Sequence, residues 1–165
     1  MLTTASLAAD KANTLLLDTK HGQVVIALLP DKAPNHVERI KTLANKGFYD
    51  GLNFHRVIPG FMAQTGDPLG NGTGGSDLSD LKAEFSDVSF QRGVVGMARA
   101  QNPDSANSQF FIMFEPGTFL NGQYTVFGRV TKGMEHVDKI KKGQGQSGMV
   151  TDPDKIVKMR TADKY

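Results

Sequence analysis

The sequence lacks cysteine, long apolar runs and blocks of one charge. Without cysteine, the chain has no disulfide bond, no thiolate nucleophile and no cysteine-based zinc or iron-sulfur site. Its apolar runs are far shorter than the roughly 18 residues of a membrane-spanning helix, so we expect no membrane partner. Lys and Arg number 19 against 17 acidic residues, and the two signs are interspersed. We therefore expect no nucleic-acid partner.

Paired metal ligands and nucleophile motifs are also missing. The four histidines are scattered, without a spacing such as His-x-x-x-His, so we expect no metal site. Neither Ser105 nor Ser108 lies in a G-x-S-x-G elbow. This pattern argues against serine-based hydrolysis.

The length of 165 residues, 39% of them apolar, suits one well-buried core and is too short for two ordinary domains. We divide the chain into an N-terminal extension at 1–13, flexible or similar to the tail of a signal peptide, and one domain at 14–162. Residues 2–9 include an A-x-A-like Ser6-Leu7-Ala8, but no basic or long apolar stretch precedes them. We expect a cytoplasmic location, with a periplasmic one as the alternative.

Eight short apolar runs predict β-strands, because Gly, Pro, Asn and Asp punctuate the segments between them. The runs are 14–18, 23–29, 54–58, 61–64, 94–98, 109–114, 124–130 and 155–160. A short polar connection ending in Gly22 joins the first two runs. This pattern predicts a β-hairpin.

Two further segments have helical periodicity. Residues 33–46 carry apolar positions at helical spacing between Pro34 and Gly47, and residues 134–142 do so before Gly143. Many strands, two helices and no βαβ alternation predict a mostly β fold. We expect a closed eight-stranded antiparallel β-barrel capped by two α-helices, because closure removes exposed sheet edges.

Two glycine-rich segments match the G-x-G-x-x-G pattern of dinucleotide-binding loops, at 70–75 (GNGTGG) and 143–148 (GQGQSG). No helix pattern opens at the end of the first segment, and neither a strand nor an acidic ribose partner follows it. We interpret this segment as a loop whose glycines permit positive φ and close approach of a ligand backbone. The second match arises by chance, and its residues 144–148 (QGQSG) are interpreted as a mobile surface loop.

His55 and Arg56 are neighbours in a predicted strand, where adjacent side chains point to opposite faces. We predict that His55 is a hydrogen-bonded core residue. Arg56 is then the surface-facing group.

Five segments with distinctive residues follow one another along the chain. They are 53–67 (NFHRVIPGFMAQTGD), 70–75, 96–100 (GMARA), 107–112 (NSQFFI) and 119–128 (FLNGQYTVFG). In this order they resemble the signature series of the cyclophilin family, over about residues 14–160. The resemblance implies a peptidyl-prolyl cis-trans isomerase, without a cofactor, that acts on proline-containing peptides and on unfolded or folding proteins.

The resemblance also implies roles for individual residues. Arg56 is the catalytic residue, and Gln64 orients it and binds substrate backbone. The proline ring is held by Phe61, Met62, Phe111 and Leu120. The residue before proline lies along Ala98, Arg99 and Gln109. The other implied substrate-binding residues are Phe54, His55, Gly74, Ala100, Phe119 and Tyr124.

Prolyl isomerisation suits this set of residues because it needs no proton transfer and no covalent intermediate. Its barrier of roughly 20 kcal/mol comes from amide resonance. When the bond twists, the proline nitrogen regains a lone pair, to which a fixed guanidinium can donate a hydrogen bond. Arg56 is the candidate donor.

Three positions depart from the pattern of many relatives. Arg99 replaces an Asn, and its long cation is expected to alter which residues are preferred before proline. Phe119 and Tyr124 replace the Trp and His of many eukaryotic relatives, a pairing similar to bacterial cyclophilins. Because Phe lacks an indole N–H, we expect an active enzyme that binds cyclosporin with reduced affinity.

Two other functions compete with this one. A binding module of the same fold would capture proline-containing segments without turnover, but the presence of Arg56 favours catalysis. A nucleotide-binding protein using residues 70–75 ranks well below both. A single compact domain is most simply a monomer.

Overall fold

The structure is a computed structural model that describes residues 3–4 and 10–165. The predicted domain at 14–162 lies within these residues. The signal-like segment at 2–9, and with it much of the predicted extension at 1–13, lies largely outside them. Within the described ranges, no helix combines the length and apolar character needed to cross a membrane.

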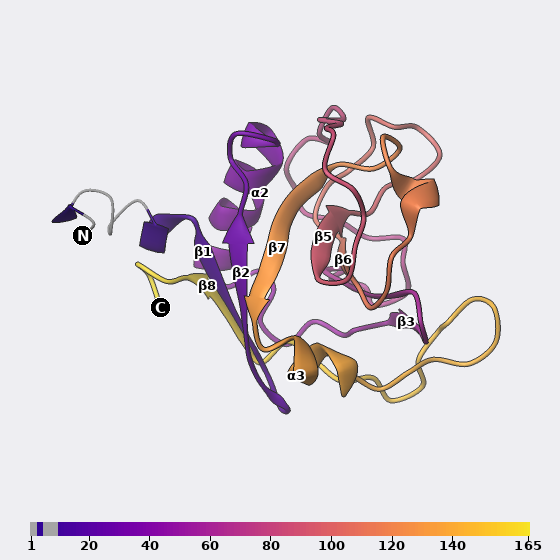
Figure 1. Ribbon diagram of the computed structural model, residues 1–165. Coiled ribbons are helices and arrows are strands. Elements are labelled where there is room, and N and C mark those ends of the chain that lie inside the picture. The colour runs from indigo at the N-terminus through magenta and orange to yellow at the C-terminus, as the bar shows by residue number, and fades with distance from the viewer. Residues whose placement is uncertain (1–2, 5–9) are drawn as a thin grey trace.

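Eight strands in the described part of the chain form one curled antiparallel sheet (Figure 1). They are β1 (Thr14–Thr19), β2 (Gly22–Leu28), β3 (Arg56–Ile58), β4 (Met62–Thr65), β5 (Val94–Met97), β6 (Phe110–Met113), β7 (Val126–Lys132) and β8 (Lys158–Thr161). Their order across the sheet is β3-β4-β6-β5-β7-β2-β1-β8. The predicted mostly β, antiparallel architecture is confirmed.

The sheet is not a closed barrel, and that part of the prediction is wrong. β3 and β8 stand at its two ends without pairing along their length, and one isolated bridge joins the segments before them, at Asn53 and Lys155. The outer edge of β3 is already occupied: the Val57 N–H donates to the Gly148 carbonyl at 2.8 Å, and the Gly143 N–H donates to the Val57 carbonyl at 2.8 Å. A loop therefore fills the position that β8 would need for closure.

The predicted hairpin is confirmed as β1 and β2. Thr19 pairs with Gly22 at its turn. Alternate side chains point into the core, where Leu15, Leu17 and Ile26 have no exposed surface. This period of two is expected for a sheet with one buried face.

The first predicted helix is confirmed as α2 (Pro34–Asn45), which contacts β8 and β7. Its own N-cap residue, Ala33, offers no side-chain hydrogen bond. Instead, the Glu84 carboxylate, from a distant loop, accepts the N–H groups of Asn35 and His36 at 3.2 and 2.8 Å. Glu84 thus satisfies two of the free donors at the start of the helix and complements its dipole.

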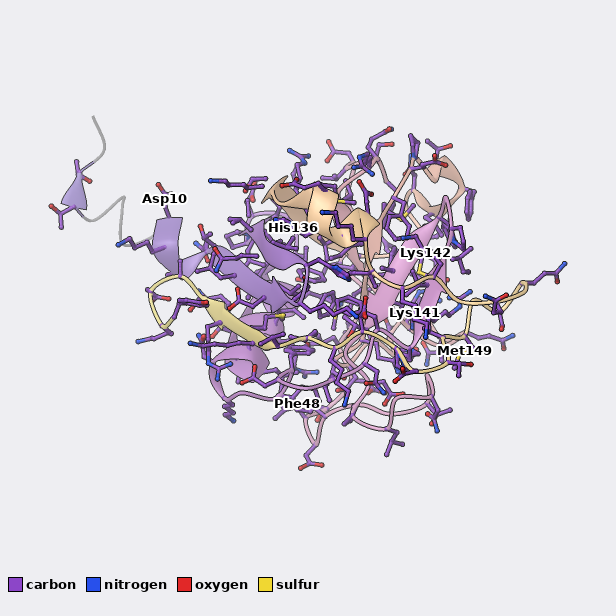
Figure 2. All side chains as sticks on the ribbon, turned by 90° about the horizontal axis from the view of Figure 1, so that it is seen from below. Asp10, Phe48, His136, Lys141, Lys142 and Met149 are labelled. Atoms are coloured by element: carbon purple, nitrogen blue, oxygen red, sulfur yellow. The ribbon has the colours of Figure 1, made fainter. Side chains whose placement is uncertain are left out.

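The second predicted helix is shorter than expected. The helix α3 covers only Met134–Asp138 and contacts β2. After it, the N–H groups of Lys139 and Ile140 donate to carbonyls three residues back, a tightening typical of helix ends. Figure 2 shows Lys141 and Lys142 on the same side of the molecule as Met149. The next residue, Gly143, donates its N–H to the Val57 carbonyl of β3.

Two groups of buried apolar side chains form the interior. The larger lies between α2 and the sheet and includes Phe54, Phe110 and Phe127. The smaller consists of Met62, Phe90, Val94, Phe111, Met113, Leu120 and Val126. This second group lies under the candidate site and fixes the side chains that line it.

A buried carboxylate, Asp154, ties three surface segments together before β8. It accepts hydrogen bonds from Lys20 and His21 of the hairpin turn, both at 2.9 Å, and from the Lys141 N–H at 2.9 Å. Burial alone would raise the pKa of Asp154, but these donors outweigh burial and lower the pKa to about 2. The charged form is therefore the one that the folded state stabilises.

We expect the free energy of unfolding to fall as the pH is lowered from about 4 towards 2, because Asp154 protonates near pH 3.9 in the unfolded chain but near 2 in the folded one. Because Lys20 is exposed, solvent weakens its ion pair with Asp154, and the expected loss of unfolding free energy is only roughly 1–2 kcal/mol. Urea unfolding at pH 5 and pH 2.5 measures it. Asp154→Asn should flatten this dependence, whereas Asp152→Asn, at an exposed neighbour, should not. An equally steep dependence in both variants would contradict the assignment.

Candidate active site

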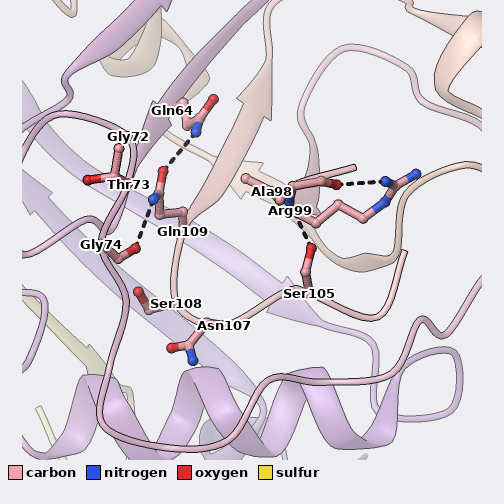
Figure 3. Close-up of a pocket in the computed structure, with 11 residues that line it drawn as sticks. Gln64, Gly72, Thr73, Gly74, Ala98, Arg99, Ser105, Asn107, Ser108 and Gln109 are labelled. Carbon is pink, nitrogen blue, oxygen red and sulfur yellow. Dashed lines mark hydrogen bonds between the residues drawn. The ribbon is translucent and has the colours of Figure 1, made fainter. Parts of the chain in front are cut away.

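Two adjoining cavities open on the face formed by β3, β4, β6 and the loops around them. The first, about 320 Å³, is lined by Arg56, Phe61, Met62, Gln64, Ala98, Arg99, Phe111, Phe119, Leu120 and Tyr124. The second, about 170 Å³ and more polar, is lined by Gln64, Gly72, Thr73, Gly74, Ala98, Arg99, Ala100, Ser105, Asn107, Ser108 and Gln109 (Figure 3). Gln64, Ala98 and Arg99 belong to both, so an extended chain can pass from one into the other.

The floor of the first cavity is aromatic. The Phe111 ring stacks on Phe90 with centroids 5.8 Å apart, and it meets the Tyr124 ring edge to face at 5.9 Å. Gly96 on β5 leaves room for this arrangement, since a Cβ there would lie 2.6 Å from the Phe111 ring. The cavity is therefore a preformed apolar recess of the kind that holds a small ring.

The rim of this cavity is more exposed than its floor. Phe119 lies within a short 3-10 helix, η1 (Thr118–Leu120), and 71% of its surface is accessible. Its ring tilts against that of Phe61, with centroids 5.5 Å apart. Because Phe119 lies at the exposed rim and does not cover the cavity, a peptide can enter from this side.

Arg56 is held at the edge of the apolar cavity by two fixed acceptors. Its backbone pairs with Gln64 across β3 and β4, and its Nη1 donates to Gln64 Oε1 at 3.1 Å. Its Nε donates to the Ser147 carbonyl at 2.9 Å. Nη2 has no hydrogen-bond partner among residues 3–4 and 10–165. The guanidinium is oriented and keeps free donor capacity.

A chain of side-chain amides continues from Gln64. Its Nε2 donates to Gln109 Oε1 at 2.9 Å, and Gln109 Nε2 donates to the Gly74 carbonyl at 2.9 Å (Figure 3). Because each amide has one donor end and one acceptor end, the Gly74 carbonyl fixes the direction of both side chains. Gln64 therefore presents its oxygen to Arg56.

Asp67 organises the loop that supplies this carbonyl. The Asp67 residue is fully buried, and its carboxylate accepts the N–H groups of Leu69, Asn71 and Gly72 at 2.8, 3.1 and 2.6 Å. Burial alone would raise the pKa of Asp67, yet these backbone donors hold it below its ordinary value. Gly72 has φ 93, a conformation that glycine adopts without strain.

The same contacts argue against a nucleotide site in the loop at 70–75. A phosphate-binding loop presents free N–H groups to an anion. Here the N–H groups of Asn71 and Gly72 are taken by the Asp67 carboxylate, whose charge would repel a phosphate.

Arg99 does not extend freely into solvent. Its guanidinium carbon lies 4.5 Å from the centroid of the Tyr124 ring. Its Nη2 donates to the Gln123 carbonyl at 2.6 Å, and its Nη1 donates to the Ala100 carbonyl at 2.9 Å. Arg99 therefore joins two loops and forms part of the wall between the cavities.

Most of the predicted site residues line the two cavities. They are Arg56, Phe61, Met62, Gln64, Gly74, Ala98, Arg99, Ala100, Gln109, Phe111, Phe119, Leu120 and Tyr124. Phe54 and His55 line neither, since Phe54 belongs to the main core and His55 is 2% exposed. Burial lowers the pKa of His55.

His55 is a core residue as predicted. Neither ring nitrogen makes a hydrogen bond of ordinary geometry in the described chain, and a backbone contact with Asn53 only opposes the effect of burial on its pKa. The Ser147 carbonyl and Asp67 were not predicted as parts of the site. A backbone carbonyl carries no sequence signal. Asp67 had one, since an Asp before a run of glycines is typical of a side chain that binds the next backbone amides.

Comparisons with known proteins place these residues in context. A family model described as cyclophilin type peptidyl-prolyl cis-trans isomerase/CLD matches residues 14–161. A probable peptidyl-prolyl cis-trans isomerase of Brucella suis biovar 1 (strain 1330) is 60% identical over 163 residues, covering 92% of this chain and 83% of the relative. Peptidyl-prolyl cis-trans isomerase B of Bacillus subtilis (strain 168) is 45% identical over 122 residues, covering 73% of this chain and 85% of the relative.

Solved structures agree with the sequence matches. The cyclophilin AquaCyp293 of Hirschia baltica superposes with a TM-score of 0.82 at 27% identity, covering 98% of this chain and 81% of that one. A Cryptosporidium parvum cyclophilin type isomerase, solved in the presence of the dipeptide Ala-Pro, has a TM-score of 0.82 at 28% identity and covers 90% and 98% of the two chains.

Proposed function

The chain belongs to the family of cyclophilin-type peptidyl-prolyl cis-trans isomerases, and we infer that it accelerates rotation about Xaa-Pro peptide bonds. One observation carries the assignment to this site. Beside a preformed apolar cavity, the Arg56 guanidinium is held by Gln64 and the Ser147 carbonyl while Nη2 stays available. We propose Arg56 as the catalytic residue and Gln64 as the residue that orients it.

The chemistry follows from the peptide bond itself. A planar Xaa-Pro amide is held by resonance, and the barrier to rotation is roughly 20 kcal/mol. As the bond twists, the proline nitrogen becomes pyramidal and can accept a hydrogen bond. A donor that is already fixed stabilises this state more than the planar one, and so lowers the barrier without forming a covalent bond.

The apolar cavity supplies the binding that this step needs. We propose that the proline ring lies on Phe111, between Met62, Phe61 and Leu120, within reach of Arg56. The adjoining residues of the peptide then run past Ala98 towards the polar cavity. Because the floor is preformed, binding orders the substrate more than the protein.

A coupled assay of cis-to-trans conversion in a short Xaa-Pro peptide tests this function. We expect the rate to rise in proportion to protein concentration. A proline-binding module without turnover is the second candidate, favoured by the size and apolar floor of the cavity. Folded protein that binds the peptide without accelerating conversion would support the binding module.

We propose that cyclosporin binds with reduced affinity, because Phe119 offers an exposed ring without an N–H donor. Phe119→Trp is expected to strengthen inhibition by about two- to tenfold, since one added hydrogen bond contributes roughly 0.5–1.5 kcal/mol. Inhibition constants of the two proteins, assayed in parallel, measure the effect. Equal inhibition of the two proteins would contradict the proposal.

Other expectations from the sequence stand as proposals. We propose that the substrates are proline-containing segments of unfolded or folding proteins. The protein acts as a monomer, in the cytoplasm, or in the periplasm if residues 2–9 are the tail of a signal peptide. We propose that α2 and α3 cover the two openings of the curled sheet.

A further inference from the structure

We propose that Arg99 makes the site prefer substrates with an acidic residue next to the proline, on the side that enters the polar cavity. This inference rests on the proposed isomerase function and names the substrate class of the same site. It follows from the charge of the cavity walls, from how Arg99 is held, and from where it lies.

The walls of the two cavities carry positive charge only. Their charged residues are Arg56 and Arg99, and no Asp or Glu lines either cavity. The nearby carboxylate of Asp67 is buried beneath the loop and bound by backbone N–H groups. A peptide in the site therefore meets two guanidinium groups and no exposed carboxylate on the walls.

The charge of Arg99 is fixed in position but not neutralised. Its guanidinium donates hydrogen bonds to the carbonyls of Gln123, Ala100 and Gln101, and its flat face covers the Tyr124 ring. No carboxylate of the described residues lies within ion-pair distance of it. Carbonyls and an aromatic face orient a guanidinium without cancelling its charge.

Arg99 lies where a substrate residue next to the proline would pass. It lines both cavities together with Gln64 and Ala98, so a peptide with its proline on Phe111 must cross this wall to enter the polar cavity. Figure 3 shows the backbone of Arg99 on the other side of that cavity from Gln109 and Gly74, with its guanidinium directed away from them, on the side of the Tyr124 ring. Because the guanidinium is already ordered, a carboxylate approaching it does not have to immobilise a flexible cation.

The charge of the cavity walls suits a single carboxylate side chain of a peptide and not a nucleic acid. A strip of two arginines is too small for a nucleic-acid surface, and the chain has nearly balanced charge. A single acidic side chain meets the half-buried cation of Arg99. The expected preference is modest, roughly two- to fivefold, as for an exposed ion pair.

The test is kcat/KM for a matched series of short peptides with Glu, Gln or Lys either directly before or directly after the proline. We expect Glu to exceed Gln by roughly two- to fivefold at one of these positions, and Lys to fall below Gln. Added salt at 0.5 M should reduce the difference, because it screens exposed charges. Equal values for Glu, Gln and Lys at both positions would overturn the preference while leaving the isomerase established. No turnover of any peptide would instead contradict the proposed function.

Three variants locate the cause. Arg99→Gln should lower the Glu-to-Gln ratio towards one, and Arg99→Lys, which keeps the charge but not the planar contacts, should retain more of it. Arg129→Gln removes the same charge from an exposed position on β7 that lines neither cavity, and should leave the ratio as in wild type. An equal fall in Arg129→Gln, or a ratio in Arg99→Gln unchanged from wild type, would overturn the role of Arg99.

Discussion

Arg56→Ala is expected to lower kcat/KM for prolyl isomerisation by about 10²–10³-fold, the range found when one fixed donor to a transition state is removed. The guanidinium is oriented by Gln64 and the Ser147 carbonyl, and it keeps a free nitrogen beside the apolar cavity. The cavity floor does not involve Arg56, so peptide binding should fall far less than turnover. The coupled assay and a peptide titration by NMR measure the two quantities.

Two controls separate this effect from a loss of folded protein. Arg129→Gln removes an arginine outside the cavities and should leave turnover unchanged. Arg56→Lys keeps the charge but loses the two-point attachment to Gln64 and Ser147, and should recover only a small part of the activity. Full activity in Arg56→Lys would show that charge alone is sufficient. Full activity in Arg56→Ala would contradict the proposed mechanism.

Asp67→Asn is expected to lower the free energy of unfolding by about 2–4 kcal/mol, because several hydrogen bonds to a buried charge are lost together. An amide keeps one acceptor oxygen, but its NH₂ group then faces backbone donors such as the Gly72 N–H. The loop carrying the Gly74 carbonyl loses its anchor, and with it the fixed direction of Gln109 and Gln64. We expect kcat/KM to fall by at least about tenfold, since small misplacements of catalytic groups are costly.

Asp104→Asn is the matched control, because Asp104 accepts a single N–H, from Ala83, on an exposed loop. Its effect on stability should stay below about 1 kcal/mol. Urea unfolding gives the stability of each variant, and activity is compared at equal folded concentration. An Asp67→Asn variant as stable and active as Asp104→Asn would contradict the role of the buried carboxylate.

Local patterns predicted the strands and the first helix, because those elements depend on residues close in sequence. The β1–β2 hairpin and α2 lie where alternation and helical spacing indicated them. Closure of the barrel was not predictable in this way. It depends on what occupies the outer edge of β3, and that is the distant segment at Gly143 and Gly148.

The features of the site also fall into those that the sequence predicted and those that depend on distant contacts. Arg56 and the apolar lining were identified through the resemblance of their segments, and most of them meet in one place. The direction of the Gln64 and Gln109 amides depends on a carbonyl far along the chain, so no local pattern reports it. The contacts of Arg99 with the Gln123 carbonyl and the Tyr124 ring were likewise not predicted, because they are set by how two loops pack.

The most direct test of catalysis by a non-covalent twist is exchange spectroscopy by NMR on an Ala-Pro peptide at equilibrium, with and without the protein. Without catalysis the isomers interconvert in about 10–100 s at 25 °C. With catalytic amounts of wild-type protein, we predict that cis and trans signals show exchange cross-peaks, because the isomers then interconvert within about one second. The isomer populations should stay unchanged. Signals that shift on binding but show no exchange would contradict the account and identify a proline-binding module.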